Sequence, residues 1–500
     1  MIFSNSVSAQ KITYADPVRE DSKDINFEVI GKIKGNILIF KNVRWKYAIS
    51  VYDDNMQLKE KVPMDFMPDK TFNVNYVYSG DQIFMIYQYQ KRGIVYCMSA
   101  TLNQDAQLVG EPVQIDTTDI GTVGDNNIYS TISSEDRKRI MVFKIHKKNT
   151  KLHIGTLLFN NQMKLDHRTR FTMDFNERKE IFSDFLVDNE GNLVFTRSSR
   201  ITNRDNFSSI EMLVKAAFSD TLKITKIQSP ELYTDDVKLK IDNFNKKYIA
   251  NCFFYGQRRG NIDGVYTIIW NAVSDSADVQ VLNPFTDSLR AVAKASGAYK
   301  FAFNDFFIKN IIVKKDGGFL LAAEDFTSQV SGGNNWNRWD YLYNSPFVSP
   351  FNSFYYNPYY FGYNDWGGFY RPFNSFNSVQ NTRYYYDNIV IISISKTGET
   401  LWSTVIQKQQ YYDNNDNYLS YCTMNMGGEI HFLFNLLDKR DKFLSDQAVD
   451  ASGIVQRNPT IKSYLKGYEF MPRFAKQIGA RQIIVPCTYR SQISFAKIDF

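Results

Sequence analysis

Arginine and aromatic side chains gather in three long segments between predicted strands, and they are the residues best suited to chemistry in this sequence. The segments SSRITNRDNFSS and GQRRGNIDG carry the arginines, and the third segment, residues 331–384, carries tryptophans and tyrosines. Arg, Tyr and Trp are enriched where proteins bind their partners, and guanidinium groups pair favourably with aromatic faces. The sequence therefore predicts a partner-binding surface made of Arg197, Arg200, Arg204, Arg258, Arg259, Trp336, Trp339, Tyr355, Tyr356, Tyr359, Tyr360, Trp366 and Tyr370.

The third segment has the composition of an adaptable binding loop. Asn, Ser, Pro and Gly separate its rings, as in SFYYNPYYFGYNDW, and charges are few. Antibody loops combine rigid aromatic rings with the same small polar residues. An exposed aromatic surface of this size without a partner would favour aggregation, so we expect it to contact a protein or a glycan. The alternative is a self-packed or disordered lid.

A search for catalytic and metal-binding patterns is mostly negative. The sequence lacks the nucleophile elbow G-x-S-x-G, the zinc motif H-E-x-x-H, a P-loop and a dinucleotide-binding fingerprint. His146, His153 and His167 lie on neighbouring predicted strands, but Lys147 and Arg168 would repel a cation. The sequence favours a non-enzymatic protein with no metal and no cofactor. The alternative is a polysaccharide hydrolase or lyase whose acid and base lie on separate repeats, a pair that no spacing motif reveals.

The composition limits the class of protein further. The 500 residues include 39 Phe, 32 Tyr and 6 Trp but only 4 His, which suits packing better than catalysis. A net charge of +6 is too mild for a nucleic-acid groove. No apolar stretch is long enough to span a bilayer. We expect buried free thiols at the four cysteines, with a bridge between Cys422 and Cys487 as the alternative in an oxidising compartment.

The first ten residues, MIFSNSVSAQ, resemble the end of a secretory signal peptide. They contain the small-residue pattern Val7-Ser8-Ala9 before Gln10, but no basic segment and no full apolar segment. Such a pattern is typical of a cleavage site. We expect an exported protein, located in the periplasm, on the cell surface or outside the cell, with an outer-membrane or cell-surface complex among its expected partners. The alternative is an ordinary frayed terminus.

A hairpin of two strands around a tight polar or glycine turn recurs eight times, and a second turn then joins two further strands. The hairpins lie at residues 34–40, 79–87, 135–143, 190–195, 245–254, 316–322, 427–434 and 479–485. Four strands in a repeat of about 40 to 55 residues is the spacing of a β-propeller blade. The chain therefore resembles β-propeller repeat proteins in pattern. A single GETLW at residues 398–402 resembles the blade motif of quinoprotein-like propellers, but one copy implies no quinone cofactor.

This pattern predicts an all-β fold with a single propeller over residues 11–500, interrupted by the aromatic insertion at 331–384. We expect eight four-stranded blades, with seven as the alternative, and closure of the ring by the N-terminal strand. A β-sandwich pair or a solenoid would leave more open sheet edges. Proline cannot donate to a strand ladder, so Pro63, Pro112, Pro284 and Pro459 fit outermost strands, whereas Pro472 and Pro486 fall in predicted inner strands.

The long segments then share one side of the ring. All three are predicted to connect the second and third strands of repeats four, five and six. Because connections of that kind emerge from the same face of a propeller, we expect them to form one surface on adjacent blades.

Overall fold

The computed structural model describes residues 10–19, 25–120, 128–176, 178–200, 202, 205–227, 232–294, 301–331, 338, 382–438, 441–461 and 467–500. Strands dominate these residues, which also contain the short helix α1 (Asp287–Ala293) and the 3-10 turn η2 (Pro472–Phe474). In the described part of the chain, no helix has the length and hydropathy needed to cross a membrane.

Antiparallel meanders of four strands form the first part of the chain, as the hairpin pattern predicts. Dense apolar runs make the second strand of each meander, and short polar turns separate it from the first. The three meanders are β2 (Ile25–Ile33), β3 (Asn36–Val43), β4 (Lys46–Tyr52) and β5 (Leu58–Pro63); β6 (Phe72–Ser79), β7 (Gln82–Lys91), β8 (Ile94–Leu102) and β9 (Val113–Asp119); and β10 (Tyr129–Ser133), β11 (Arg139–Lys148), β12 (Lys151–Asn160) and β13 (Leu165–Asp174).

The next two meanders are hydrogen-bonded into one nine-stranded sheet because the short strand β18 (Tyr233–Thr234) pairs with a strand of each. Their strands are β14 (Glu180–Val187), β15 (Leu193–Arg200), β16 (Phe207–Lys215) and β17 (Leu222–Ile227), then β19 (Lys238–Asp242), β20 (Lys247–Tyr255), β21 (Gly264–Asn271) and β22 (Ser276–Pro284).

Two further meanders follow, the first of which carries an extra strand, β27. They are β23 (Phe306–Val313), β24 (Phe319–Val330), β25 (Thr382–Ile394), β26 (Thr400–Ile406) and β27 (Gln410–Asp413), then β28 (Tyr421–Asn425), β29 (Glu429–Asp438), β30 (Asp441–Asp450) and β31 (Val455–Arg457). Since β25 begins at Thr382, the last three residues of the predicted insertion belong to a strand.

The last sheet joins the two ends of the described chain. Strand β1 (Lys11–Tyr14) pairs antiparallel with β35 (Gln492–Asp499), which continues to β34 (Gln482–Tyr489) and then to β32 (Tyr468–Phe470) and β33 (Lys476–Gly479). The predicted closure of the ring by the N-terminal strand is therefore confirmed. The prediction that Pro472 lies in an inner strand is wrong, because Pro472 opens η2 between β32 and β33. Proline suits that position, where its missing N–H costs no strand hydrogen bond.

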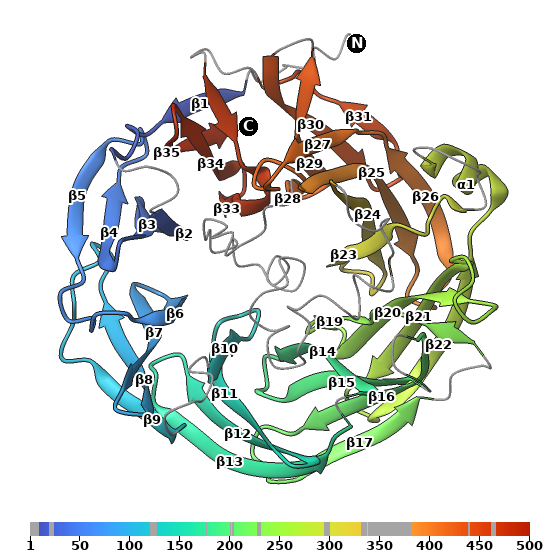
Figure 1. Ribbon diagram of the computed structural model, residues 1–500, viewed down its shortest axis with the longest axis horizontal. Helices are drawn as coiled ribbons and strands as arrows, with labels where there is room; N and C mark the ends of the chain where they lie inside the picture. Colours follow the sequence, from blue (N-terminus) through green and yellow to red (C-terminus); the bar gives the residue numbers. More distant parts are fainter. Residues whose placement is uncertain are drawn as a thin grey trace.

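The sheets are arranged around a central axis, with the first strand of each meander innermost and the fourth outermost (Figure 1). Eight large apolar clusters each combine residues from two successive meanders, and the last of them joins the final sheet to the first meander. Fully buried rings such as Trp270, Tyr76 and Phe195 fill these layers. The fold is thus a β-propeller, and the count of eight blades, with seven as the alternative, stays a prediction.

Candidate functional site

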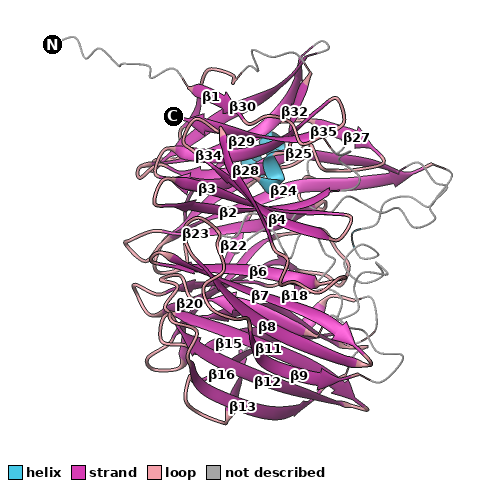
Figure 2. Ribbon diagram, turned by 90° about the vertical axis from the view of Figure 1, so that its left-hand side faces the viewer, coloured by secondary structure: helices cyan, strands magenta, loops and turns pink. Residues whose placement is uncertain are grey.

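Three successive long connections begin at the ends of β15, β20 and β24, which lie on one side of the ring, and most of the third connection lies outside the described residues. They join β15 to β16, β20 to β21 and β24 to β25, and each is the connection between the second and third strands of its meander. The remaining turns of these meanders, between first and second or third and fourth strands, are tight and lie on the opposite side. Figure 2 shows β24 reaching beyond the ends of its neighbours on the side of the long connections.

The arginines predicted from the first connection have partners within their own blade. Arg197 lies on β15, and its Nε donates to Glu211 Oε2 at 2.6 Å. Arg200, at the end of β15, is buried and donates from Nε to the carbonyl of Arg178 at 3.1 Å. The role of these two side chains in binding a partner stays a prediction.

The second connection is tied to the first through Asp205. Arg258 Nη2 lies 2.5 Å from Asp205 Oδ2 and also donates to Thr202 Oγ1 at 3.0 Å. Burial alone would raise the pKa of Asp205, but the hydrogen bonds from Arg258 and Thr202 outweigh burial and lower that pKa. Arg258 and Arg259 remain about half exposed, with side-chain exposures of 47% and 51%. This part of the predicted surface is therefore a braced pair of loops with two accessible guanidiniums.

The rest of the predicted binding set lies outside the described residues, namely Arg204, Trp336, Trp339, Tyr355, Tyr356, Tyr359, Tyr360, Trp366 and Tyr370. One described residue inside the insertion, Arg338, is buried. Its Nη2 lies 2.7 Å from Asp235 Oδ2, and its guanidinium lies 4.1 Å from the ring centroid of Phe307. The Asp235 carboxylate also accepts from the Tyr255 hydroxyl at 2.7 Å. Arg338 thus fastens the insertion to two neighbouring blades, a role that the sequence did not signal.

Beyond the body of the ring, β24 and β25 continue as a three-stranded extension. Here residues 326–330 of β24 pair with residues 382–386 of β25, and β27 pairs with β25 along its other edge. We call residues 326–330, 382–386 and 410–413 the extension. It connects the blade directly to the insertion.

One face of the extension is exposed and carries aromatic and arginine side chains. Tyr385 and Tyr411 are cross-strand partners with ring centroids 6.3 Å apart, and Tyr411 is 52% exposed. Arg383 lies over the Tyr411 ring at 5.1 Å and binds Asp413 through two hydrogen bonds of 2.7 and 3.0 Å. The ion pair and the tilted ring contact link the side chains of Arg383, Tyr385, Tyr411 and Asp413 to one another. Sequence reasoning missed this face, although the run of Thr and Tyr in TRYYYD favours a strand.

The opposite face of the extension packs against the ring. Tyr384 and Tyr412 are cross-strand partners there, and Tyr412 lies 5.0 Å from the Tyr418 ring. Both contact a small apolar cluster formed by Phe307, Phe326, Tyr386 and Leu419. The extension is therefore anchored on one side and accessible on the other.

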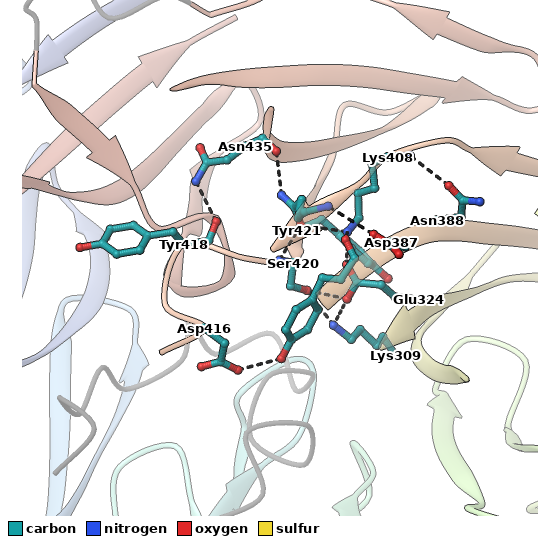
Figure 3. A network of polar contacts seen from close by, with 12 residues as sticks. Lys309, Glu324, Asp387, Asn388, Lys408, Asp416, Tyr418, Ser420, Tyr421 and Asn435 are labelled. Atoms are coloured by element: carbon teal, nitrogen blue, oxygen red, sulfur yellow. Dashed lines mark hydrogen bonds and ion pairs between the residues drawn. The ribbon is translucent and has the colours of Figure 1, made fainter. Parts of the chain in front are cut away.

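A buried network of charged groups lies at the base of the extension (Figure 3). The carboxylate of Glu324, on β24, contacts Lys309 Nζ, Lys408 Nζ at 2.7 Å and the hydroxyl of Ser420 at 2.7 Å. Lys309 Nζ also donates to Ser420 Oγ at 2.7 Å, and Lys408 Nζ donates to Gln410 Oε1 at 2.9 Å. These residues come from β23, β24, the segment after β26, β27 and the segment before β28. The network thus joins the extension to two adjacent blades.

Burial and pairing shift the titration of these groups in opposite directions. Burial lowers the pKa of Lys309 to about 8, although the Glu324 carboxylate favours its charged form. Burial alone would raise the pKa of Glu324, but Lys309 and Lys408 hold it below its ordinary value. Perturbed groups of this kind cluster at functional sites, and they also occur in structural ion-pair networks. Glu324 and the Lys408 side chain are fully buried, so this network fits a structural role.

The extension is further supported from the last sheet. Arg473, in η2, pairs with the Asp416 carboxylate and lies 5.7 Å from the Tyr386 ring. The Tyr386 hydroxyl donates to Asp416 Oδ2 at 2.7 Å. Asp416 therefore has protein partners on two sides.

Histidine and cysteine side chains do not gather into a reactive centre in the described part of the chain. His146 and His153 are cross-strand partners, whereas the register places His167 on the other face of the sheet, where its Nε2 lies 3.2 Å from Asp220 Oδ1. No group of three or more metal-binding side chains forms among the described residues. The four cysteines are free thiols, so Cys422 and Cys487 are not bridged.

With fold and site in view, the chain is a protein of the β-propeller class. It matches no known family profile, and no curated protein matches it at a significant level. Among solved structures, the chain is similar to the WD40 domain of SCAP from fission yeast, with 8% identity, 98% coverage of each chain and a TM-score of 0.39. It is also similar to a PL25 ulvan lyase, with 11% identity over 84% of this chain and 90% of the other, at a TM-score of 0.36.

A third likeness is to prolyl oligopeptidase B from Galerina marginata, with 10% identity and a TM-score of 0.41. It covers 94% of this chain but only 55% of that enzyme. Because all three identities and TM-scores are low, the assignment to the β-propeller class rests on the sheet topology described above.

Proposed function

We propose that this protein is an exported, non-enzymatic binding module, and that a protein partner contacts the exposed face of the extension and the neighbouring long connections. The observation that carries the proposal is the exposed face itself, where Arg383, Tyr385 and Tyr411 are held in place by an ion pair and cross-strand ring contacts. Ordered aromatic and arginine side chains lose little entropy on binding, which is why they dominate binding hot spots.

The arrangement of acidic and basic groups supports binding over catalysis. The most perturbed cluster, around Glu324, is closed off from solvent and joins two blades. The accessible side chains of the extension include Tyr411, Arg383 and the carboxylate of Asp413, and the ion pair with Arg383 lowers the pKa of Asp413. A hydrolase or lyase would need an acid and a base that can reach a substrate. A screen for hydrolysis or lyase activity on the intact protein tests this alternative. Turnover abolished by substitution of a single carboxylate would contradict the proposal.

The first test replaces the two rings of this face, exposed Tyr411 and half-buried Tyr385, with serine. Tyr385→Ser with Tyr411→Ser should leave the ring folded, because both side chains lie on the outer face of the extension. The matched control is Phe244→Ser, an aromatic residue that is 83% exposed in the tight turn between β19 and β20, on the opposite side of the ring. Full-length tagged proteins are purified from the native host, and co-purifying proteins are quantified by mass spectrometry.

We expect a partner that Phe244→Ser retains and the double tyrosine variant loses, since hot-spot rings each contribute about 2 kcal/mol or more. Equal recovery by all three proteins would contradict the proposal. A glycan array with the same three proteins tests a carbohydrate partner. Glycan binding that depends on the two tyrosines would show that the partner at this face is a carbohydrate and not a protein.

A second test removes the insertion without breaking the blade. Val330 and Thr382 are cross-strand partners, so an Asn-Gly turn in place of residues 331–381 would close the hairpin with favourable geometry. This deletion also removes Arg338 and leaves the buried Asp235 carboxylate without that partner, so Asp235→Asn is included. A folded ring that still binds the partner would restrict the binding surface to the extension.

Export is the remaining part of the proposal, supported by the small-residue pattern before Gln10. Fractionation of the native host, with detection of the protein by antibody, tests it. Recovery in the periplasmic, surface or extracellular fraction is expected, and recovery in the cytoplasm alone would contradict it.

A further inference from the structure

A hollow opens between the blade of β6–β9 and the blade of β10–β13, away from the extension. It is lined by Asp116 on β9, Tyr129 on β10, Lys144 on β11, Gly155 on β12 and three residues of β13, Arg168, Thr169 and Arg170, together with apolar neighbours. In Figure 1, β9 and β13 lie at adjacent outer positions of the ring. The hollow therefore sits where two outermost strands meet.

The strand register places the basic side chains of the hollow in one row. Tyr129 pairs with Lys144, Lys144 with Gly155, and Gly155 with Arg170. Cross-strand partners share a face of the sheet, so these four positions cross the blade in a line. Arg168 lies two residues from Arg170 on the same face. The strand register thus brings Lys144 of β11 to the same place as Arg168 and Arg170 of β13.

Asp116 offsets only part of this positive charge. Its Oδ2 lies 2.6 Å from Lys144 Nζ and accepts from the Tyr129 hydroxyl at 3.0 Å, while Arg168 Nη1 lies 3.5 Å from its Oδ1. Three cations and one carboxylate line the hollow, which leaves a formal excess of two positive charges. Arg170 is exposed and makes no hydrogen bond or ion pair with any described residue. Its guanidinium is available to a ligand.

Gly155 keeps the floor of the hollow open. Its φ is not in the left-handed region, so the backbone there does not require glycine, and an added Cβ would make ordinary contacts with Lys144 Cγ at 3.4 Å and Arg170 Cγ at 3.9 Å. Glycine in the middle of a strand weakens the sheet and often marks the close approach of a ligand or another chain. Here the missing side chain leaves room beside the two basic residues.

We propose that this hollow binds a small oxyanion of the sulfate, phosphate or carboxylate class, with Arg170 as the main donor and Arg168 beside it. A guanidinium presents two parallel N–H donors that match such an anion. Lys144, held by Asp116 and by Thr118 Oγ1 at 2.9 Å, contributes charge from the floor. The inference does not rest on the proposed function of the extension, because the two sites share no residue.

Isothermal titration calorimetry of the full-length protein at low ionic strength tests the proposal, with sodium sulfate, sodium phosphate and sodium glucuronate as separate probes. Injections of sodium chloride at the same ionic strength control for general screening. We expect saturable binding of at least one probe to a single site. Arg170→Ala should weaken it at least tenfold, and Gly155→Val should weaken it similarly by filling the floor without changing the charge.

The matched control is Arg457→Ala, which removes an exposed arginine of β31 on another blade and should leave the affinity unchanged. Circular dichroism melting curves verify that each variant is folded. No saturable heat for any probe would overturn the proposal. So would an equal loss of affinity in Arg170→Ala and Arg457→Ala, because that result shows only a general charge effect. The probe that binds most tightly identifies the kind of oxyanion.

Discussion

Removal of the Glu324 carboxylate should destabilise the protein far more than removal of the whole charged network. Glu324→Leu leaves the ammonium groups of Lys309 and Lys408 buried without their shared counter-ion. Loss of one partner from a buried ion pair costs about 3–5 kcal/mol, because the remaining charge is desolvated and unpaired. Two ammonium groups depend on this one carboxylate, so we expect the upper part of that range.

The triple variant Glu324→Leu, Lys309→Met, Lys408→Met removes every charge of the network and keeps similar side-chain volumes. Replacement of a whole buried ion network by apolar residues is often neutral or stabilising. We therefore expect the triple variant to recover most of the loss. Ser420 and Gln410 would lose hydrogen-bond partners, which limits the recovery by about 1–3 kcal/mol.

Urea unfolding followed by tryptophan fluorescence measures the free energy of unfolding for the wild type and both variants. The matched control is Lys32→Met, which removes an ammonium group from a more accessible ion pair with Asp54 and should change stability by less than about 1 kcal/mol. A loss below about 1 kcal/mol in Glu324→Leu, or a triple variant no more stable than the single one, would refute the reasoning about this network.

Three further predictions concern the ring itself. Burial raises the pKa of Glu28 to about 7, so the folded state binds the carboxyl proton more tightly than the unfolded chain does. The contribution of this proton to the free energy of unfolding is complete below about pH 4.5 and is lost as the pH rises through 7. In urea titrations, the free energy of unfolding of Glu28→Gln should rise by about 3 kcal/mol relative to that of the wild type between pH 4.5 and pH 7.5. A difference in free energy of unfolding that does not change with pH would contradict this reasoning about Glu28. Gly453 has φ +88°, and an added Cβ would lie 2.6 Å from the Trp402 ring, so Gly453→Ala should lower stability by about 1–3 kcal/mol. Gly35→Ala, with φ +87° and open space, should cost less; equal losses would show that the ring contact is unimportant. Deletion of residues 1–18 removes β1 and exposes the edge of β35, which should lower the unfolding midpoint and promote self-association in light-scattering measurements, whereas an unchanged midpoint would show that closure by β1 contributes little.

The fold could be predicted from sequence because its determinants are local and repeated. Turn residues such as Gly35, Gly80 and Gly317 have positive φ, and each lies between two dense apolar runs. These turn and strand signals recur in each repeat, so a strand that is assigned wrongly in one repeat can be recognised by comparison with the others. The strand pattern failed at Pro472, where a 3-10 turn splits the innermost strand of the last sheet. That irregularity occurs once and has no repeat to reveal it.

The candidate sites were less predictable because they depend on contacts between distant segments. Arg338 pairs with Asp235 across 103 positions, and Lys309 meets Ser420 across 111. No local sequence pattern indicates which arginines form ion pairs or hydrogen bonds within the protein. Arg200, for example, is buried although its sequence context suggests an exposed loop. The hollow around Arg170 is similar, since Lys144 of β11 reaches Arg168 and Arg170 of β13 only through the strand register.

Site-specific photo-crosslinking tests the central claim, that the exposed face of the extension contacts a partner, most directly. A photoreactive phenylalanine analogue replaces Tyr411 in one protein and Phe244 in another, both produced in the native host at native levels. We predict that irradiation joins the protein with the analogue at position 411 to one discrete partner, identified by mass spectrometry, and that the protein with the analogue at position 244 forms no such adduct. The absence of an adduct at 411, or the same adduct from both positions, would contradict the account.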